Sequence, residues 1–283
     1  MGGTGGSTLD DMSNVPTPFS EAATYYSFRA PYAPAAFDFI SDALGLNAQS
    51  QVLDLGCGPG TLTLPLSRRA GHVVAVDPCQ EMIDEGLRRA ADAGYHNIEW
   101  HCMRAEDFCR SSQRRFALAT MGQAFHWMDR DGVLQYLSRL LDPSHGALVL
   151  VNPGRRQPQE SWEPIANEVI ARYLGKRSRH PDMHPEPKHE PALLRSEFFA
   201  DFTAREFSTC VERDIRSIIG HTYSLSSSPR SSFGARAPEF EAELTKALLS
   251  LNPTGRFIER VDTEVMLARG RNQDTGRSES LAP

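Results

Sequence analysis

The sequence has no long apolar run, no paired-cysteine motif and no strongly basic stretch. Although 40% of the 283 residues are hydrophobic, no run approaches the roughly 20 consecutive apolar residues that a membrane span requires. The five cysteines form no Cys-x-x-Cys pair, which argues against structural zinc or a disulfide framework and favours a reducing, cytoplasmic setting. The formal net charge of −6 disfavours a nucleic-acid partner, because holding a polyanion needs clustered positive charge.

The two ends of the sequence also lack periodic apolar residues. Residues 1–20 and 271–283 are polar, so we expect a flexible N-terminal arm and a flexible tail. The first residues carry neither a basic region nor an apolar core, and no signal peptide is expected. Residues 154–200 include a polar, proline-rich stretch. Because long insertions in compact domains commonly form lids or binding loops, we predict a mainly helical lid there.

Short apolar runs alternate with helical patterns through residues 21–153. The expected strands are 51–55, 72–76, 97–102, 116–121 and 147–151. The expected helices are 34–44, 62–69, 81–93 and 130–141. This alternation predicts an α/β, Rossmann-like, doubly wound sheet that is mostly parallel and covered on both faces. Residues 201–270 are expected to complete the core with late strands, the clearest at 258–267; further helices are expected at 162–174 and 239–251.

A buried strand runs directly into three glycines in the segment VLDLGCGPG, residues 52–60. Gly56, Gly58 and Gly60 permit positive φ and let the backbone lie close to a ligand. The helix behind them presents free N–H groups and a partial positive charge. In a doubly wound sheet this loop lies at the carboxyl ends of the strands, which is where ligands bind. The segment therefore predicts a ligand site.

The next strand ends in Asp77, whose carboxylate can accept both hydroxyls of a ribose. That geometry suits any adenosine-containing ligand, so an NAD-dependent oxidoreductase is one alternative. The nicotinamide fingerprint is G-x-G-x-x-G, whereas here Asp54 stands two residues before the first of three glycines at spacing two. An acid in front of the glycines favours a ligand with an ammonium group and no pyrophosphate, which is S-adenosylmethionine.

With these features the segment resembles the class I S-adenosylmethionine-dependent methyltransferases, in particular the small-molecule type with the VLDLGCGPG loop (methyltransferase domain 11/25-like). The resemblance covers residues 24–152 well and the remainder weakly. It implies a seven-stranded sheet, S-adenosyl-L-methionine as cofactor, S-adenosyl-L-homocysteine as product, and methyl transfer to O, N or C of a small molecule. A non-methylating, cyclase-like enzyme that binds the same cofactor is another alternative, because a fold does not fix a function.

The resemblance also implies residue roles around the cofactor. The glycine loop would flank its methionine part, Asp77 would hold the ribose, and Pro78 with Met82 would line the adenine. Arg104 stands where this family commonly has an Asp, so the contact to the adenine amino group is assigned to Glu106. The full set of implied cofactor-binding residues is Asp54, Gly56, Cys57, Gly58, Gly60, Asp77, Pro78, Met82, Ala105, Glu106 and Gln123.

His126 lies in a Phe-His-Trp segment that resembles the family's loop after the fourth strand. It is a candidate general base, since a free histidine titrates near pH ~6.5, or else a residue that only shapes the pocket. His221 and Tyr223 belong to a hydroxyl-rich run that is expected to follow a helix. The candidate acceptor-binding residues are Tyr25, Tyr26, Arg29, Phe125, Trp127, His221 and Tyr223.

Two missing motifs narrow the acceptor. Methylation of exocyclic base nitrogens usually uses an Asn- or Asp-Pro-Pro-aromatic tetrad, but residues 121–124 read Met-Gly-Gln-Ala. No loop with two spaced glutamates, as protein arginine methylation needs, is recognisable. We therefore expect a small-molecule acceptor, no nucleic-acid or membrane partner, and a protein that works alone or as a homo-oligomer. No metal site is expected, because three histidines lie in a proline-rich loop without the helical geometry that would bring them together on a metal; they are His180, His184 and His189.

Overall fold

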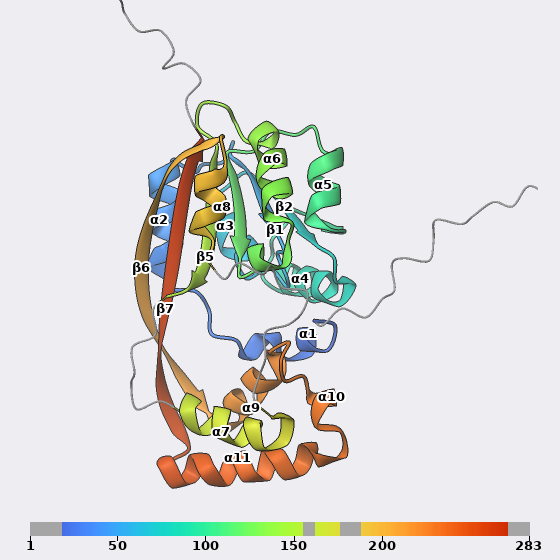
Figure 1. The fold of residues 1–283 in the computed structure, drawn as a ribbon, viewed down its shortest axis with the longest axis vertical. Helices are drawn as coiled ribbons and strands as arrows, with labels where there is room; N and C mark the ends of the chain where they lie inside the picture. The colour runs from blue at the N-terminus through green and yellow to red at the C-terminus, as the bar shows by residue number, and fades with distance from the viewer. Residues whose placement is uncertain (1–18, 155–161, 176–187, 271–283) are drawn as a thin grey trace, which may run out of the picture.

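Seven strands form one sheet in the order β3-β2-β1-β4-β5-β7-β6 (Figure 1). The computed structural model describes residues 19–154, 162–175 and 188–270. The strands are β1 (Gln51–Leu55), β2 (His72–Asp77), β3 (Ile98–Cys102), β4 (Leu118–Gly122), β5 (Ala147–Pro153), β6 (Phe199–Asp214) and β7 (Arg256–Gly270). The first five are parallel, and β7 runs antiparallel between β5 and β6. The predicted doubly wound, mostly parallel, seven-stranded sheet is confirmed.

Helices cover both faces of this sheet. Those of the described chain are α1 (Ala22–Tyr25), α2 (Pro34–Leu44), α3 (Thr63–Ser67), α4 (Gln80–Asp92), α5 (Ala105–Ser111), α6 (Arg130–Leu140), α7 (Glu163–Leu174), α8 (Glu190–Arg195), α9 (Ile215–Ser224), α10 (Arg230–Phe233) and α11 (Ala237–Leu251), with 3-10 turns η1 (Tyr26–Phe28), η2 (Phe125–Trp127) and η3 (Gly234–Arg236). Helices α2, α3 and α4 pack on one face, against residues such as Val52 and Val73. Helices α5, α6 and α8 pack on the other, against Leu53 and Val74. Successive strand residues are therefore buried on opposite faces, which explains the continuous apolar runs.

A separate helical layer closes one end of the sheet (Figure 1). Helices α7, α9, α10 and α11 share an apolar cluster in which the rings of Phe233 and Phe240 lie 4.1 Å apart. This layer combines α7, from the segment assigned to a lid, with helices from residues 215–251, which the sequence assigned to the C-terminal part of the core. Tertiary packing thus joins two segments that lie far apart in the sequence.

Strands β6 and β7 form a long antiparallel ribbon that reaches from the sheet to the helical layer (Figure 1). The sequence identified β7 in part, as 258–267, but did not locate β6. Most β6 side chains after Phe202 are exposed, so this edge strand has no apolar face for periodicity to reveal. The expectation that His221 follows a helix was wrong, because His221 lies inside α9.

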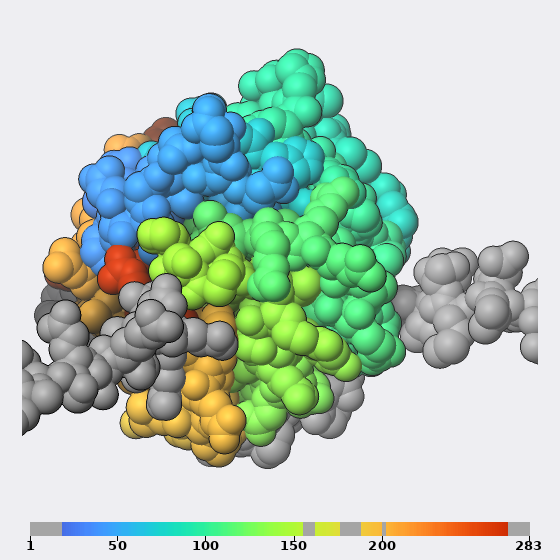
Figure 2. All heavy atoms as spheres, turned by 90° about the horizontal axis from the view of Figure 1, so that it is seen from above, coloured from blue at the N-terminus to red at the C-terminus, as the bar shows by residue number. Residues whose placement is uncertain are grey.

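The core draws on distant parts of the chain. Viewed from above, the surface combines N-terminal (blue), central (green) and C-terminal (orange) segments side by side (Figure 2).

No helix in the described ranges combines the length and the apolar character that crossing a membrane demands. The histidines His180 and His184 lie outside the described residues; among the residues that are described, no cluster of His, Cys, Asp and Glu is suited to hold a metal ion.

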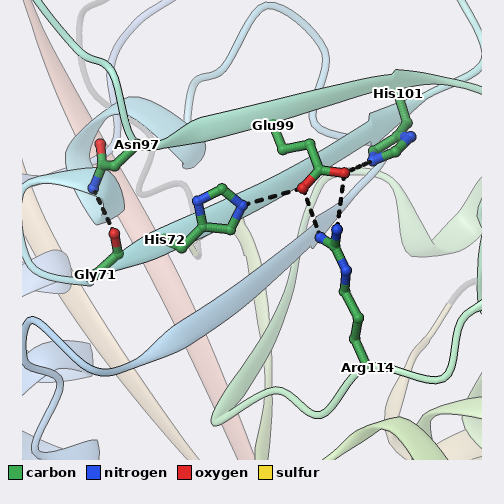
Figure 3. A network of polar contacts seen from close by, with 6 residues as sticks. All are labelled: Gly71, His72, Asn97, Glu99, His101 and Arg114. Atoms are coloured by element: carbon green, nitrogen blue, oxygen red, sulfur yellow. Dashed lines mark hydrogen bonds and ion pairs between the residues drawn. The ribbon is translucent and has the colours of Figure 1, made fainter.

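A carboxylate-centred network covers the β2–β3 edge of the sheet (Figure 3). Glu99 on β3 accepts hydrogen bonds from Arg114 at 2.7 and 3.2 Å, and its oxygens lie 2.7 Å from His101 Nε2 and 3.3 Å from His72 Nε2. Hydrogen bonding by Arg114 is the largest cause that lowers the pKa of Glu99, to about 2. Charged groups at the edge of a sheet also discourage pairing with a foreign strand.

Candidate functional site

The glycine loop between β1 and α3 has the backbone that the sequence predicted. Gly56, Gly58 and Gly60 have φ of +67°, +53° and +86°, values that favour glycine. At Gly56 a Cβ would lie 2.4 Å from the Cβ of Ala124, so the loop after β4 approaches closely. At Gly58 the nearest atom to such a Cβ is the Tyr26 hydroxyl, at 3.7 Å. The loop is thus pressed against β4's loop on one side and faces the N-terminal segment on the other.

Asp77, at the end of β2, is bonded to the glycine loop. Its Oδ2 accepts a hydrogen bond from the Gly58 N–H and its Oδ1 from the Cys79 N–H, both at 2.9 Å. Burial is the largest cause acting on this carboxyl and raises its pKa, and the two backbone donors oppose that rise. Each oxygen keeps a further lone pair. The carboxylate is therefore held in place by the backbone while it retains the capacity to accept two hydroxyls.

Asp54 lies beneath the loop and is only 1% exposed. Its Oδ2 accepts from the Thr63 hydroxyl at 2.6 Å and its Oδ1 from the Thr120 hydroxyl at 2.9 Å. Burial raises its pKa to about 7, although the two hydroxyl donors oppose the rise. Both threonines were missed from the sequence. Thr120 pairs with Asp54 in the β1–β4 register, and a hydroxyl within an otherwise apolar strand was the available signal.

An additional polar atom marks the same loop. The Thr61 hydroxyl is buried and has no hydrogen-bond partner within the described residues. Buried polar groups are normally paired. A buried hydroxyl without a partner, next to the three glycines, is therefore available to a bound ligand. With Asp77 and the positive-φ glycines, it fits an adenosine-containing ligand that carries a polar tail.

The residues assigned to the adenine differ in their exposure and in the protein contacts that they already make. Pro78 is exposed, whereas Met82 is 2% exposed and packs with Ala22 and Ala23 of α1. Ala105 is buried at the start of α5. The carboxylate of Glu106 accepts from the Asp129 N–H at 3.1 Å and from Arg104 at 3.4 Å. Two described protein donors therefore already bind Glu106, the residue assigned to the adenine amino group.

A cavity of about 480 Å³ lies between the loops after β4 and β5, the N-terminal segment, the first half of β7 and helices α7 and α9. Its walls include the side chains that follow β4, namely Gln123, His126 and Trp127. Gln123 has a positive φ of 52°, and its N–H donates to the Val151 carbonyl at 3.0 Å. The loop therefore turns sharply at Gln123. Its contact with β5 uses the N–H of Gln123 and leaves the carbonyl of Gln123 out.

Five residues that the sequence singled out line this cavity: Arg29, Gln123, His126, Trp127 and His221. Arg29 also connects the cavity to the glycine loop. The Nη1 of Arg29 donates to the Tyr26 hydroxyl at 3.3 Å, and that hydroxyl faces Gly58.

Four other acceptor-binding candidates do not line the cavity: Tyr25, Tyr26, Phe125 and Tyr223. Phe125 is 1% exposed in the main core, and Tyr223 is 2% exposed in the helical layer, where its hydroxyl donates to Glu241. Tyr25 packs edge-on against Tyr223 at 5.3 Å. The rings of Phe125, Tyr25 and Tyr223 fill the two cores, whereas Tyr26 packs in a small cluster with α1 and faces Gly58.

The sequence also missed wall residues that come from β7. Glu259 and Asp262 line the cavity because the ribbon extends past the sheet. Glu259 accepts from the buried Arg213 at 2.6 Å, and Arg213 also donates to the Phe28 carbonyl at 2.6 Å. These acids reach the cavity because the ribbon is long. No local sequence pattern indicates that length.

Comparison with known proteins identifies the fold and the loop. Residues 52–144 match the family described as "Methyltransferase domain". Human tRNA (uracil-5-)-methyltransferase homolog A is 32% identical over 124 residues, which are 44% of this chain and 17% of that protein. Ubiquinone biosynthesis O-methyltransferase of Xanthomonas oryzae pv. oryzae is 27% identical over 164 residues, 58% of this chain and 67% of that protein. The chain spans less than a fifth of the length of the first curated relatives that it matches.

Two solved structures share the architecture. A protein of Anaeromyxobacter dehalogenans described as a candidate type II methyltransferase superposes with a TM-score of 0.63 at 22% identity, covering 86% of this chain and 97% of that one. An S-adenosylmethionine-dependent methyltransferase of Geobacter sulfurreducens, in complex with S-adenosyl-L-homocysteine, gives a TM-score of 0.51 at 19% identity, covering 92% and 100%. Residues 52–144 thus match a methyltransferase domain, and the seven-stranded sheet has the class I methyltransferase fold.

Proposed function

We propose that this protein transfers a methyl group from S-adenosylmethionine to a small molecule. The observation that carries the proposal is the cavity of about 480 Å³ between the sheet and the helical layer, whose wall includes Gln123, next to the Ala124 that packs against the glycine loop. Small-molecule sites typically measure about 300–1,000 Å³ and combine apolar walls with a few polar groups. Here the walls include the rings of Trp127 and Trp162 together with His126 and Gln123.

The cofactor, when bound, supplies an electrophilic methyl group on a sulfonium. Asp77 would hold its ribose, because this carboxylate is fixed by two backbone donors and keeps two lone pairs. Gly58 and Gly60 let the backbone lie against its methionine part, and Thr61 offers a buried hydroxyl. Asp54 supports the loop from below through Thr63. The other assigned cofactor contacts, Glu106 included, belong to the same proposal.

His126 is the residue that we place at the reacting atom. It lies on the cavity wall directly after the β4 loop and stacks on His189 at 6.3 Å. The acceptor would lose a proton on taking up the methyl group that the cofactor supplies, and the imidazole of His126 would accept that proton. The walls align the acceptor with the methyl group, and this alignment alone supplies much of the rate. The role of His126 as a base can therefore be separated from its role in shaping the cavity.

The helical layer serves as the roof over the acceptor. Helices α7 and α9 contribute wall residues on the side away from the sheet, and α10 and α11 support them through a shared apolar cluster. We therefore extend the lid assigned to residues 154–200 to include helices of residues 215–251. A roof of this kind excludes water from the reacting groups.

The experiment that tests this function follows the methyl group. The purified protein is incubated with methyl-tritiated S-adenosylmethionine and a cell extract separated into small-molecule, protein and RNA fractions. We expect label in the small-molecule fraction, and much less of it when Asp77→Ala replaces the wild type at a cofactor concentration that does not saturate the variant. Label confined to RNA would instead favour an activity like that named for the tRNA-acting relative. Cofactor binding without label in any fraction would support the non-methylating alternative.

A further inference from the structure

The indole of Trp162, just before the start of α7, holds a buried hydrogen-bond donor. The residue lines the cavity although it is only 3% exposed. Its Nε1–H has no hydrogen-bond partner within the part of the chain that the structure describes. Buried donors are rarely left unpaired. An indole nitrogen donates and cannot accept, so the group that complements it carries an acceptor atom such as a carbonyl or carboxylate oxygen.

Arg29 brings a positive charge to the same cavity. Its Nε and Nη2 donate to the hydroxyl and carbonyl of Ser224, at 3.3 and 2.6 Å, and its Nη1 donates to the Tyr26 hydroxyl at 3.3 Å. All of these partners are neutral, and no described carboxylate pairs with this guanidinium. Three of the five N–H donors of an arginine are thus used and two remain. Arg29 is anchored in position, and its charge is not neutralised by the anchor.

The side chains of Trp162 and Arg29 both contact the C-terminal end of α9. Trp162 packs edge-on against His221, with ring centroids 5.4 Å apart, and Arg29 binds Ser224. His221 and Ser224 are three residues apart in one helix and are neighbours on its surface. Helix α9 therefore contacts both side chains, through two residues that are neighbours on its surface.

The charges of the walls limit the anion that fits. The acids that line the cavity are Glu163, Glu259 and Asp262, and the arginines are Arg29 and Arg260. Arg260 donates to Asp262 at 2.8 Å and so contributes a paired charge. Surroundings with more acids than arginines repel a dianion such as a phosphate monoester more strongly than a monoanion. The aromatic walls, Trp127 among them, suit a flat apolar body.

We propose that Arg29 and Trp162 form a carboxylate subsite, and that the methyl acceptor is a small carboxylic acid. This inference rests on the proposed function, since the carboxylate belongs to the acceptor of that reaction. The acid group lies at the end of α9 and the body of the molecule extends along the wall toward His126. Charge-assisted hydrogen bonds are stronger than neutral ones, so the subsite favours the acid over its neutral amide.

The probes are benzoate and cinnamate, each compared with its amide, added to protein saturated with S-adenosyl-L-homocysteine. The indole N–H signals of Trp100, Trp127 and Trp162 are followed by NMR after labelling with ¹⁵N-tryptophan, and Trp162→Phe assigns the signal. We expect the Trp162 signal to move with the acids and not with the amides. The Trp100 signal, from a residue that packs against Gly60 and Gly86 away from the cavity wall, serves as an internal reference.

Two variants locate the charge. Arg29→Gln is expected to weaken binding of the acids by about tenfold or more, in line with loss of a charged hydrogen-bond partner, and to leave the amides unchanged. Arg260→Gln is the matched control: it removes an arginine from the same cavity whose charge is already paired, and the preference for acids should persist. Loss of that preference in Arg260→Gln would assign it to the overall field of the cavity and overturn the subsite.

Other outcomes separate the inference from the function on which it rests. If acids and amides bind equally, or none of them binds at millimolar concentration, the carboxylate subsite is refuted. If Arg29→Gln weakens S-adenosyl-L-homocysteine but not methylthioadenosine, which lacks the amino-acid tail, Arg29 serves the cofactor carboxylate and the inference again fails. Failure of the wild type to bind S-adenosyl-L-homocysteine would refute the proposed function itself.

Discussion

Gly58 donates its backbone N–H to the Asp77 carboxylate at 2.9 Å, so the glycine loop and the acid at the end of β2 form one unit. A second backbone donor, Cys79, fixes the other oxygen at the same distance. The sequence separates these residues by a helix and a strand, and the parallel β1–β2 pairing brings them together. The orientation of the carboxylate is thus set before any ligand binds.

Asp77→Ala is expected to weaken binding of S-adenosyl-L-homocysteine by about tenfold to a hundredfold, because each hydrogen bond to a charged group contributes about 1.5–3 kcal/mol. Calorimetric titration of the purified variant measures the change. Asp92→Asn, which alters an exposed acid at the end of α4, is the control and should bind like the wild type. An unaltered affinity in Asp77→Ala would disprove the placement of the ribose.

Asp54 makes the stability of the protein depend on pH in a direction unusual for an acid. Its folded-state pKa of about 7 lies above the ordinary value of 3.8, so its stabilising contribution is complete below the lower value and is lost as pH rises through the higher one. Asp54→Asn should remove this loss. We expect the variant to gain on the wild type by at most about 4 kcal/mol between pH 4 and pH 8, since each pKa unit corresponds to about 1.4 kcal/mol.

Urea unfolding of the ligand-free protein at several pH values measures this difference. Asp38→Asn, at an exposed acid of α2, is the matched control and should show the pH dependence of the wild type. A constant stability difference between Asp54→Asn and the wild type across this range would mean that Asp54 does not titrate there.

His126→Gln is expected to lower kcat about a hundredfold or more while KM for S-adenosylmethionine stays the same, because a positioned base contributes about 10²–10⁴ in rate. High pH should partly restore the variant, since an acceptor that has already lost its proton needs no base. His189→Gln is the control, because this ring stacks on His126 without lining the cavity. A loss of only a few-fold, without recovery at high pH, would assign His126 to the shape of the pocket.

Glu99→Gln should lower the melting temperature near neutral pH, because it removes the acceptor shared by Arg114, His72 and His101. The folded pKa of Glu99, about 2, lies below the ordinary value of 4.5; its contribution is therefore complete above pH 4.5 and is lost as pH falls through 2. The difference between variant and wild type should shrink in that range. Glu212→Gln, at a highly exposed ion pair, is the control for surface charge, and an equal effect there would rule out a special role for the network.

The sequence predicted well those features that depend on local patterns. The strands β1, β2 and β5 are apolar on both faces, and the glycines of residues 56–60 require positive φ, so pattern and conformation agree. Helix α2 begins at Pro34, where the sequence predicted it, because the fixed φ of proline suits a first helical turn. Asp54 lies inside β1 and Asp77 ends β2, as the same strand patterns predicted.

Features that depend on distant pairing were not predictable in this way. Strand β6 is mostly exposed, and only its long register with β7 makes it a strand. The distinction between Phe125, which is buried in the core, and His126, which lines the cavity, arises from the turn η2 and not from residue type. Tyr223 likewise faces the helical layer because α9 continues past the point where the sequence ended it. Tertiary packing decides such positions.

The central claim is that the glycine loop and Asp77 hold S-adenosylmethionine, and calorimetry on the stripped protein tests it most directly. The protein is titrated with S-adenosylmethionine, S-adenosyl-L-homocysteine and NADH. The account predicts micromolar binding of the two adenosyl-sulfur compounds and no heat with NADH. Binding of NADH alone would contradict it, because the loop would then serve a pyrophosphate and the acid before the glycines would have another purpose.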